Sequence, residues 1–247
     1  MNSDQLGFDF LPELPTSEPV PKKRAPRAAK APVVAKAVAA AAVPAVAPTD
    51  PEAMAQALEA HPDYRVLRRL QPRLQWPGTA QGSVTRILVL DTETTGLDQA
   101  KEKIIELALL RVDVDSATGL PLGEVQVYDG LEDPGKPIPA EVVKITGITD
   151  ADVRGQALDA ARVAQLLEGV DVVIAHNAGF DRPFVEARFP AFSDVAWACS
   201  FVDIDWKGQG RGSAKLESLA QDNGWFYDAH RAEMDCHALL ALSLIHI

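Results

Sequence analysis

The sequence predicts an α/β domain, because strand-like and helix-like patterns follow one another from Val84 onward. Three apolar runs joined by short, turn-rich links come first, which favours antiparallel pairing of consecutive strands. Two shorter apolar runs then alternate with helical patterns. The five expected strands are Arg86–Asp91, Ile104–Asp113, Glu124–Tyr128, Asp171–Ala175 and Val195–Val202.

The helices are predicted from apolar spacing and from signals at their ends. Pro137–Ile145 is followed by Gly147, and glycine commonly ends a helix. Leu158–Gly169 has the apolar spacing of an amphipathic helix. Three further helices are expected, one entered at Asp181, one over Ser213–Asp222 and one that follows His230.

The chain of 247 residues is long enough for one sizeable core with appendages. Its formal net charge of −11 is unevenly distributed, because residues 1–80 hold ten Lys and Arg against eight Asp and Glu, whereas residues 81–247 hold fourteen against twenty-seven. We do not expect so acidic a domain to bind a polyanion through a broad basic surface. Bound metal would have to supply positive charge locally.

Residues 1–50 are expected to form a disordered tail, because their Pro- and Ala-rich part has too few large apolar side chains to offset the entropy lost on ordering. Residues 5–10 resemble the Gln-Leu-x-hydrophobic-x-hydrophobic peptides with which bacterial replication and repair proteins dock on the sliding clamp. The side chains that would fill the clamp pocket are Gln5, Leu6, Phe8 and Phe10.

Residues 51–80 are predicted to be a helical lead-in to the domain. Asp50 and Pro51 have the cap-then-proline signature of a helix start. The first helix would end near Ala60, and a second would cover Asp63–Leu70. The sequence has neither the pattern of a secretory signal nor an apolar run that would span a bilayer, so we expect a cytoplasmic protein with no membrane partner.

Two carboxylates follow the apolar run of the first strand. Asp91 and Glu93 are two residues apart, so the period of a strand points both side chains to one face. Like charges held side by side repel, and hard cations such as Mg²⁺ and Mn²⁺ take carboxylate oxygens while keeping positions for water and phosphate. A divalent metal site is therefore expected here. The alternative is a solvated strand end followed by a turn.

Three other residues, which follow much later in the chain, have the chemistry that such a site needs. Asp181 enters a helix just after the fourth strand, where α/β domains place chemistry, although an aspartate there also complements the helix dipole. His230 and Asp235 are five residues apart, about 140° on a helix, so they do not share a helical face. We therefore expect His230 in the loop before the last helix and Asp235 within it.

Together these five residues resemble the three exonuclease motifs of the DEDDh 3′–5′ exonucleases, the DnaQ-like family that includes the proofreading epsilon subunit of bacterial DNA polymerase III. The similarity covers residues 84–247. It implies a ribonuclease H-like fold with a five-stranded mixed sheet and helices on both sides. It also implies hydrolysis of phosphodiester bonds at the 3′ end of single-stranded or frayed DNA, with release of nucleoside 5′-monophosphates, in proofreading or repair.

The resemblance assigns a role to each catalytic residue and implies two divalent cations, Mg²⁺ or Mn²⁺, as cofactors. Asp91 would bridge the two cations, Glu93 and Asp235 would complete the nucleophile-side metal, and Asp181 would reach the other metal largely through water. His230 would take the proton from the attacking water, because an imidazole can be neutral at working pH.

The resemblance also implies a seat for the terminal nucleotide. Leu97 would act as an apolar wedge against the last bases, and Glu141 would contact the 3′-terminal sugar. Thr146 stands where the family commonly has a histidine, and Phe180 fits a core position equally well. The expected substrate-binding residues are Thr92, Thr94, Thr95, Gly96, Leu97, Glu141, Thr146, Asn177 and Phe180.

Two other functions remain open at this point. One is an RNA 3′-end trimming exonuclease, since a 2′-hydroxyl changes only one contact. The other is a non-catalytic adaptor that binds the clamp or a polymerase subunit. Retention of four carboxylates and the histidine argues against the adaptor, because clustered buried acids destabilise a domain that no longer binds metal. The expected partners are DNA 3′ ends, the sliding clamp and a polymerase subunit.

Overall fold

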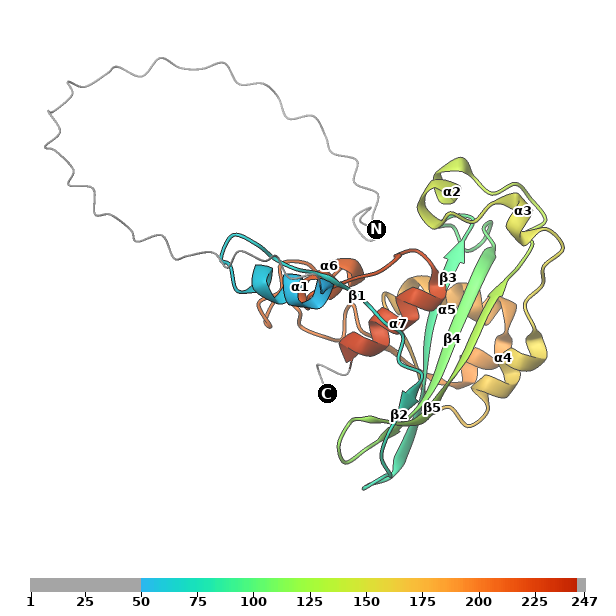
Figure 1. Cartoon of the computed structure of the whole chain (residues 1–247). Coiled ribbons are helices and arrows are strands. Elements are labelled where there is room, and N and C mark those ends of the chain that lie inside the picture. Colours follow the sequence, from blue (N-terminus) through green and yellow to red (C-terminus); the bar gives the residue numbers. More distant parts are fainter. Residues whose placement is uncertain (1–49, 244–247) are drawn as a thin grey trace, which may run out of the picture. The chain divides into compact units, whose positions relative to one another are not determined.

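The computed structural model describes residues 50–243, which form an α/β fold built on a mixed six-stranded sheet (Figure 1). Residues 1–49, which include the clamp-like peptide, and residues 244–247 lie outside the described part. The strands, in spatial order, are β2 (Gln75–Trp76), β5 (Pro121–Leu131), β4 (Ile104–Asp115), β3 (Val84–Thr94), β6 (Val172–Ala175) and β7 (Ala196–Cys199).

The two halves of the sheet pair differently. Strands β3, β4 and β5 are long and antiparallel, and β2 adds to the β5 edge in the antiparallel sense. Strands β6 and β7 are short and run parallel to β3. All five predicted strands are present, and β2 is one strand more than the sequence indicated. β3 also extends past the predicted Asp91 to Thr94, which places both carboxylates on the strand itself.

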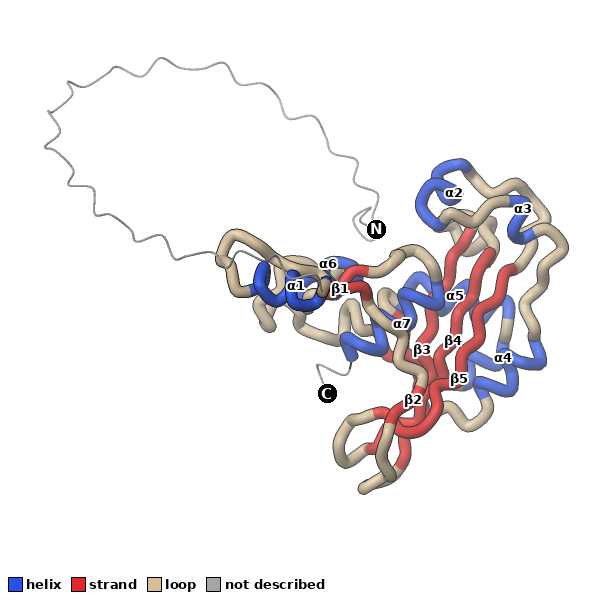
Figure 2. The backbone as a smooth tube through the Cα atoms, in the orientation of Figure 1, coloured by secondary structure: helices blue, strands red, loops and turns tan. Residues whose placement is uncertain are grey.

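Side chains of β3 alternate between two apolar cores, as the strand period requires. Leu88 and Leu90 pack on one face with helices α4 (Ala160–Leu167) and α5 (Ala178–Arg188). Ile87 and Val89 pack on the other face with α7 (Ala232–Ser243). Figure 2 shows the strands between these helices. The sheet is therefore buried on both faces at its centre.

Smaller elements connect these layers. Helix α2 (Ala140–Thr146) ends at Gly147, whose left-handed φ of 73° suits a residue without a Cβ. The helix expected from Pro137 thus begins three residues later. The remaining elements are α3 (Asp150–Val153), the 3₁₀ segment Pro190–Asp194, α6 (Leu216–Asp222) and β8 (Trp225–Phe226). Within residues 50–243, no helix combines the length and apolar character needed to cross a membrane.

The lead-in is helical only in its first part. Helix α1 (Pro51–Glu59) begins as predicted, with the Asp50 carboxylate accepting a hydrogen bond from the Ala53 N–H at 3.0 Å. The second predicted helix, Asp63–Leu70, is wrong. Its C-terminal part forms β1 (Arg68–Arg69), which pairs in parallel with β8. Pairing with a strand distant in sequence overrides the local helix pattern, because tertiary contacts outweigh propensity.

Candidate active site

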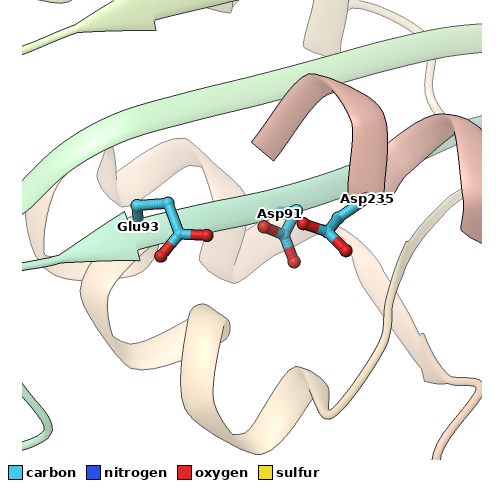
Figure 3. Close-up of side chains that lie close together, drawn as sticks. All are labelled: Asp91, Glu93 and Asp235. Carbon is cyan, nitrogen blue, oxygen red and sulfur yellow. The ribbon is translucent and has the colours of Figure 1, made fainter. Parts of the chain in front are cut away.

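Three carboxylates meet where the C-terminal part of β3 lies beside the start of α7. One oxygen of each carboxylate in the group Asp91, Glu93 and Asp235 lies within 4.8 Å of the others. Figure 3 shows the Asp91 and Asp235 carboxylates side by side, with Glu93 further along the strand. Asp91 and Glu93 continue the alternation of Ile87 and Val89, so both point to the face that α7 covers.

Burial and mutual repulsion raise the pKa values of the two strand carboxylates. Burial, followed by the charges of Asp181 and Asp235, raises the pKa of Asp91 well above its usual range. Burial, followed by Asp235 and Glu106, raises the pKa of Glu93 to about 8. Each ionised group thus makes its neighbours harder to ionise.

Asp181 approaches from the opposite face of β3. It is 2% exposed in the first turn of α5, and its Oδ1 accepts hydrogen bonds from the Thr92 N–H at 3.1 Å and the Thr92 hydroxyl at 2.7 Å. Burial raises the pKa of Asp181 to about 7, although both Thr92 bonds act in the opposite direction. Because Oδ1 takes both bonds, Oδ2 remains for a ligand. Thr92, expected at the substrate, is buried and holds Asp181.

Asp235 is held by two donors from the segment that precedes α7. The Tyr227 hydroxyl donates to its Oδ1 at 2.9 Å, and the His230 backbone N–H donates to its Oδ2 at 2.8 Å. Burial raises the pKa of Asp235 to about 6, and the hydrogen bond from Tyr227 and the charge of His230 lower it. The carboxylate therefore has a fixed orientation toward Asp91.

His230 lies in the loop before α7, as the sequence predicted, and is exposed. Its φ of 63° is in the left-handed region, which is sparsely populated by residues other than glycine, asparagine and aspartate. The hydrogen bond from its N–H to Asp235 stabilises this conformation. An exposed imidazole is thus anchored beside a buried carboxylate through its own backbone.

An ion pair missed by the sequence reasoning fixes the start of α7. Glu106 on β4 is fully buried opposite Glu93, and its carboxylate accepts hydrogen bonds from Arg231 at 2.7 Å and from the Ala232 N–H at 2.9 Å. The Ala232 N–H is one of the first of α7, which no earlier helical carbonyl can satisfy. A single acidic residue within the apolar run Ile104–Leu110 was the signal for this role.

The expected nucleotide seat surrounds the turn after β3. Thr94 donates to the Gly96 carbonyl at 2.7 Å, and the Thr95 hydroxyl donates to Glu102 at 2.5 Å. Both threonines are buried, whereas Leu97 is 50% exposed. The threonine hydroxyls therefore shape the turn, and Leu97 is the side chain there that is free to contact a base.

The remaining expected substrate residues lie on α2 and at the start of α5. Glu141 is exposed on α2, while Thr146 is buried, with its hydroxyl bonded to the Val142 carbonyl and the Ile148 N–H. Asn177 precedes α5 with a left-handed φ of 69°. Phe180 is partly buried against the core that contains Phe184, in agreement with the core alternative.

The donor set fits a divalent cation. Carboxylate oxygens are the ligands that Mg²⁺ and Mn²⁺ prefer. With a pKa of about 8, Glu93 holds a proton near neutral pH, and the pKa values of Asp91, Asp181 and Asp235 are also raised, because full ionisation would place several negative charges in one buried region. A cation would remove this repulsion, so these residues are able to hold metal.

Comparison with known families agrees with this geometry. A family model described as an exonuclease (RNase_T) matches residues 88–243, which contain all five candidate catalytic residues. The chain belongs to this exonuclease family. The first 87 residues, including α1, β1 and β2, precede the match.

Two bacterial replication proteins illustrate the relationship. The DNA polymerase III subunit epsilon of Treponema pallidum (strain Nichols) is 30% identical over 162 residues, which is 62% of this chain and 72% of that protein. The PolC-type DNA polymerase III of Bacillus subtilis (strain 168) is 34% identical over 128 residues, 50% of this chain. The chain spans only 8% of that PolC-type relative.

The fold is that of ribonuclease H-like exonucleases. The zinc-bound crystal structure of the E. coli ExoI–ssDNA complex has a TM-score of 0.53 and 25% sequence identity to this chain. The match covers 65% of this chain and 40% of the ExoI chain. The predicted family and fold class are therefore confirmed.

Proposed function

We propose that this protein is a metal-dependent 3′–5′ exonuclease that acts on single-stranded or frayed DNA ends and releases nucleoside 5′-monophosphates. The observation that carries the proposal is the convergence of Asp91, Glu93 and Asp235 within 4.8 Å, beside His230. The exonuclease family and the polymerase III relatives support it. A role in proofreading or repair, in contact with a polymerase subunit, agrees with those relatives.

The chemistry is divided between metal and protein. Two divalent cations, Mg²⁺ or Mn²⁺, held by the four carboxylates would neutralise charge on the phosphodiester and lower the pKa of the attacking water. His230 accepts the proton of that water, and its exposed loop position lets the imidazole reach it. Tyr227 and the His230 N–H keep Asp235 aimed at Asp91. The N–H and hydroxyl of Thr92 fix the orientation of the Asp181 carboxylate.

The overall charge restricts how DNA is held. Residues 81–247 carry twenty-seven acidic and fourteen basic side chains, so a long stretch of phosphodiester backbone is repelled. We propose that only the last nucleotides enter, with Leu97 against the terminal bases and Glu141 at the terminal sugar. A bound metal would supply the local positive charge.

The test compares substrates that differ in end structure and in sugar. The full chain with Mg²⁺ is incubated with 5′-labelled single-stranded DNA, duplex DNA with paired or mismatched 3′ ends, and single-stranded RNA. We expect single-stranded and mismatched DNA to yield a ladder of fragments that shorten from the 3′ end, with mononucleotides as the other product. EDTA should stop the reaction and added Mg²⁺ should restore it.

A matched pair of variants connects the activity to the site. Asp91→Ala should abolish degradation, whereas Asp113→Ala, which removes a carboxylate paired with Arg86 at the other end of the sheet, should leave it intact. Release of the 5′-terminal nucleotide first would refute the proposed direction. Faster degradation of RNA would favour the RNA-trimming alternative, and activity that survives Asp91→Ala would remove the site.

A further inference from the structure

A short segment that precedes the family match crosses the helix that carries Asp235. Residues 68–76, here named the strap, begin at β1 and end at β2. Figure 1 shows the chain passing from β1 across α7 to β2. The family match begins at residue 88, so the strap is an addition to the part of the chain that the family model covers.

The first end of the strap holds the strand that leads to the site. The Arg68 N–H donates to the Gly224 carbonyl and the Leu70 N–H donates to the Phe226 carbonyl, both at 2.8 Å. The Arg69 guanidinium lies 4.9 Å from the centre of the Phe226 ring and pairs with Asp228 at 2.9 Å. These contacts fix β8 and the residues directly after it.

The middle of the strap is buried against the support of Asp235. Leu70 is 8% exposed. It belongs to one apolar cluster with Tyr227, with Ala220 of α6 and with Ala238 of α7. Tyr227 in turn donates its hydroxyl to the Asp235 carboxylate. One continuous series of contacts therefore runs from the strap through Tyr227 to the carboxylate group.

The far end of the strap is tied to the sheet. The Val125 N–H donates to the Leu74 carbonyl at 2.9 Å, and Gln75 and Trp76 pair with Glu124 and Gly123 of β5. Trp76 packs against the core that contains Leu239 and Leu240 of α7, and Arg73 stacks on its ring at 3.7 Å. Both ends of the strap are therefore held, and its Leu70 and Trp76 share apolar clusters with residues of α7.

We propose that the strap is a positioning element that sets the Tyr227–Asp235 segment, and with it His230 and Asp235, for catalysis. The proposal rests on the proposed nuclease function, because its kinetic consequence is a change in turnover. Arg69 and Leu70 are its positioning residues, since they act through Asp228, Phe226 and Tyr227 and not by contact with the catalytic carboxylates. Small displacements of catalytic groups by remote changes reduce turnover strongly while binding is retained.

The first test reverses one charge in the full chain. Arg69→Glu places a like charge beside Asp228 and removes the cation from the Phe226 ring. Arg68→Glu is the matched control, because the Arg68 side chain pairs with Glu52 and Glu59 of α1 instead. We expect Arg69→Glu to lower kcat about five- to tenfold with little change in KM. Arg68→Glu should retain kcat, and the double variant Arg69→Glu, Asp228→Lys should recover it.

The second test removes a buried leucine from the apolar cluster of the strap and, as a control, a buried leucine from the core that α4 and α5 form on the sheet. Leu70→Ala is compared with Leu166→Ala, a fully buried leucine of α4 in the opposite core. Both variants lose stability, so kcat is measured where circular dichroism shows each to be folded. We expect Leu70→Ala to lower kcat at least about fivefold more than Leu166→Ala.

A readout independent of activity separates this inference from the nuclease proposal. Hydrogen–deuterium exchange of the backbone amides in residues 225–235 should rise in Arg69→Glu and not in Arg68→Glu. If exchange and kcat are the same in both variants, the strap has no positioning role. If the wild-type chain degrades no nucleic acid, the proposed function fails, and the exchange comparison still decides whether the strap holds the Tyr227–Asp235 segment.

Discussion

At the scale of single residues, two of the four site carboxylates, Asp181 and Asp235, have a protein hydrogen-bond partner as well as a proposed ligand. Asp181 is held by Thr92, and Asp235 is held by Tyr227 and by the His230 N–H. Such partners fix orientation before any ligand arrives, which is the condition for a preorganised site. The residue that differs is His230, because its backbone is anchored and its side chain is exposed.

His230→Ala is expected to reduce turnover by about 10²–10⁴-fold, the usual contribution of a general base. The backbone N–H that bonds Asp235 is retained in the variant, so metal binding should persist in calorimetric titration with Mn²⁺. The control is His61→Ala, because His61 is exposed in the lead-in. Loss of metal binding together with activity would show that His230 is structural.

Glu93 makes the stability of the metal-free protein depend on pH. Its pKa of about 8 in the folded protein exceeds the usual 4.5, so the folded state binds more protons than the unfolded state between these values. The free energy of unfolding should therefore be highest below about pH 4.5 for this group and fall as pH rises to about 8, with a slope near 1.4 kcal/mol per pH unit.

Denaturant unfolding of the chelator-treated protein at several pH values measures this slope. Glu93→Gln should make the profile less steep and leave the part due to Asp91, Asp181 and Asp235, whereas substitution of the exposed Glu124 by glutamine should leave the slope unchanged. Mg²⁺ should stabilise the protein more at pH 8 than at pH 5, because fewer protons must then be displaced. A wild-type profile as flat as that of Glu93→Gln would contradict the assigned environment.

At the scale of elements, the site depends on how α7 begins. The buried Glu106 of β4 accepts from both Arg231 and the Ala232 N–H, so a strand side chain caps a helix from another layer. This contact couples the register of the sheet to the start of the helix. Asp235 follows Ala232 by three residues, so the contact also sets the position of Asp235.

Glu106→Ala should lower the free energy of unfolding by about 2–4 kcal/mol, because it leaves a buried N–H and a guanidinium without their acceptor. Turnover should fall as α7 shifts. Glu106→Gln should lose less stability, since an amide oxygen can still accept from Ala232. The comparison is Glu132→Ala, which breaks the more exposed pair with Arg188 and should cost below about 1 kcal/mol. Equal losses of unfolding free energy in Glu106→Ala and Glu132→Ala would show that the Glu106 cap stabilises the fold no more than an exposed ion pair does.

At the scale of the whole molecule, three separate elements converge on one acidic centre in an acidic domain. Strand β3, helix α5 and helix α7 each contribute at least one carboxylate. The repulsion is tolerated because the sheet beneath is buried on both faces by large apolar cores. The same chain carries a clamp-like peptide, residues 5–10, ahead of the described region.

The peptide is tested separately from the nuclease site. We expect the full chain to bind a bacterial sliding clamp, and the double substitution Gln5→Ala, Phe8→Ala to weaken binding by about 10–30-fold, as for anchor residues at other interfaces. Asp4→Ala serves as the control beside the motif. Fluorescence titration measures the affinity. Equal affinity of all three proteins would dispose of this prediction.

Sequence by itself determined five of the six strands of the sheet, the place of His230 before the last helix and the family, because apolar period and motif order can be read along the chain. Only the tertiary structure decided that Glu106 caps α7, that Tyr227 holds Asp235 and that Arg68–Arg69 pairs as a strand with β8. These contacts join residues distant in sequence or leave no periodic signal, and pairing partners of that kind are fixed only when the layers pack.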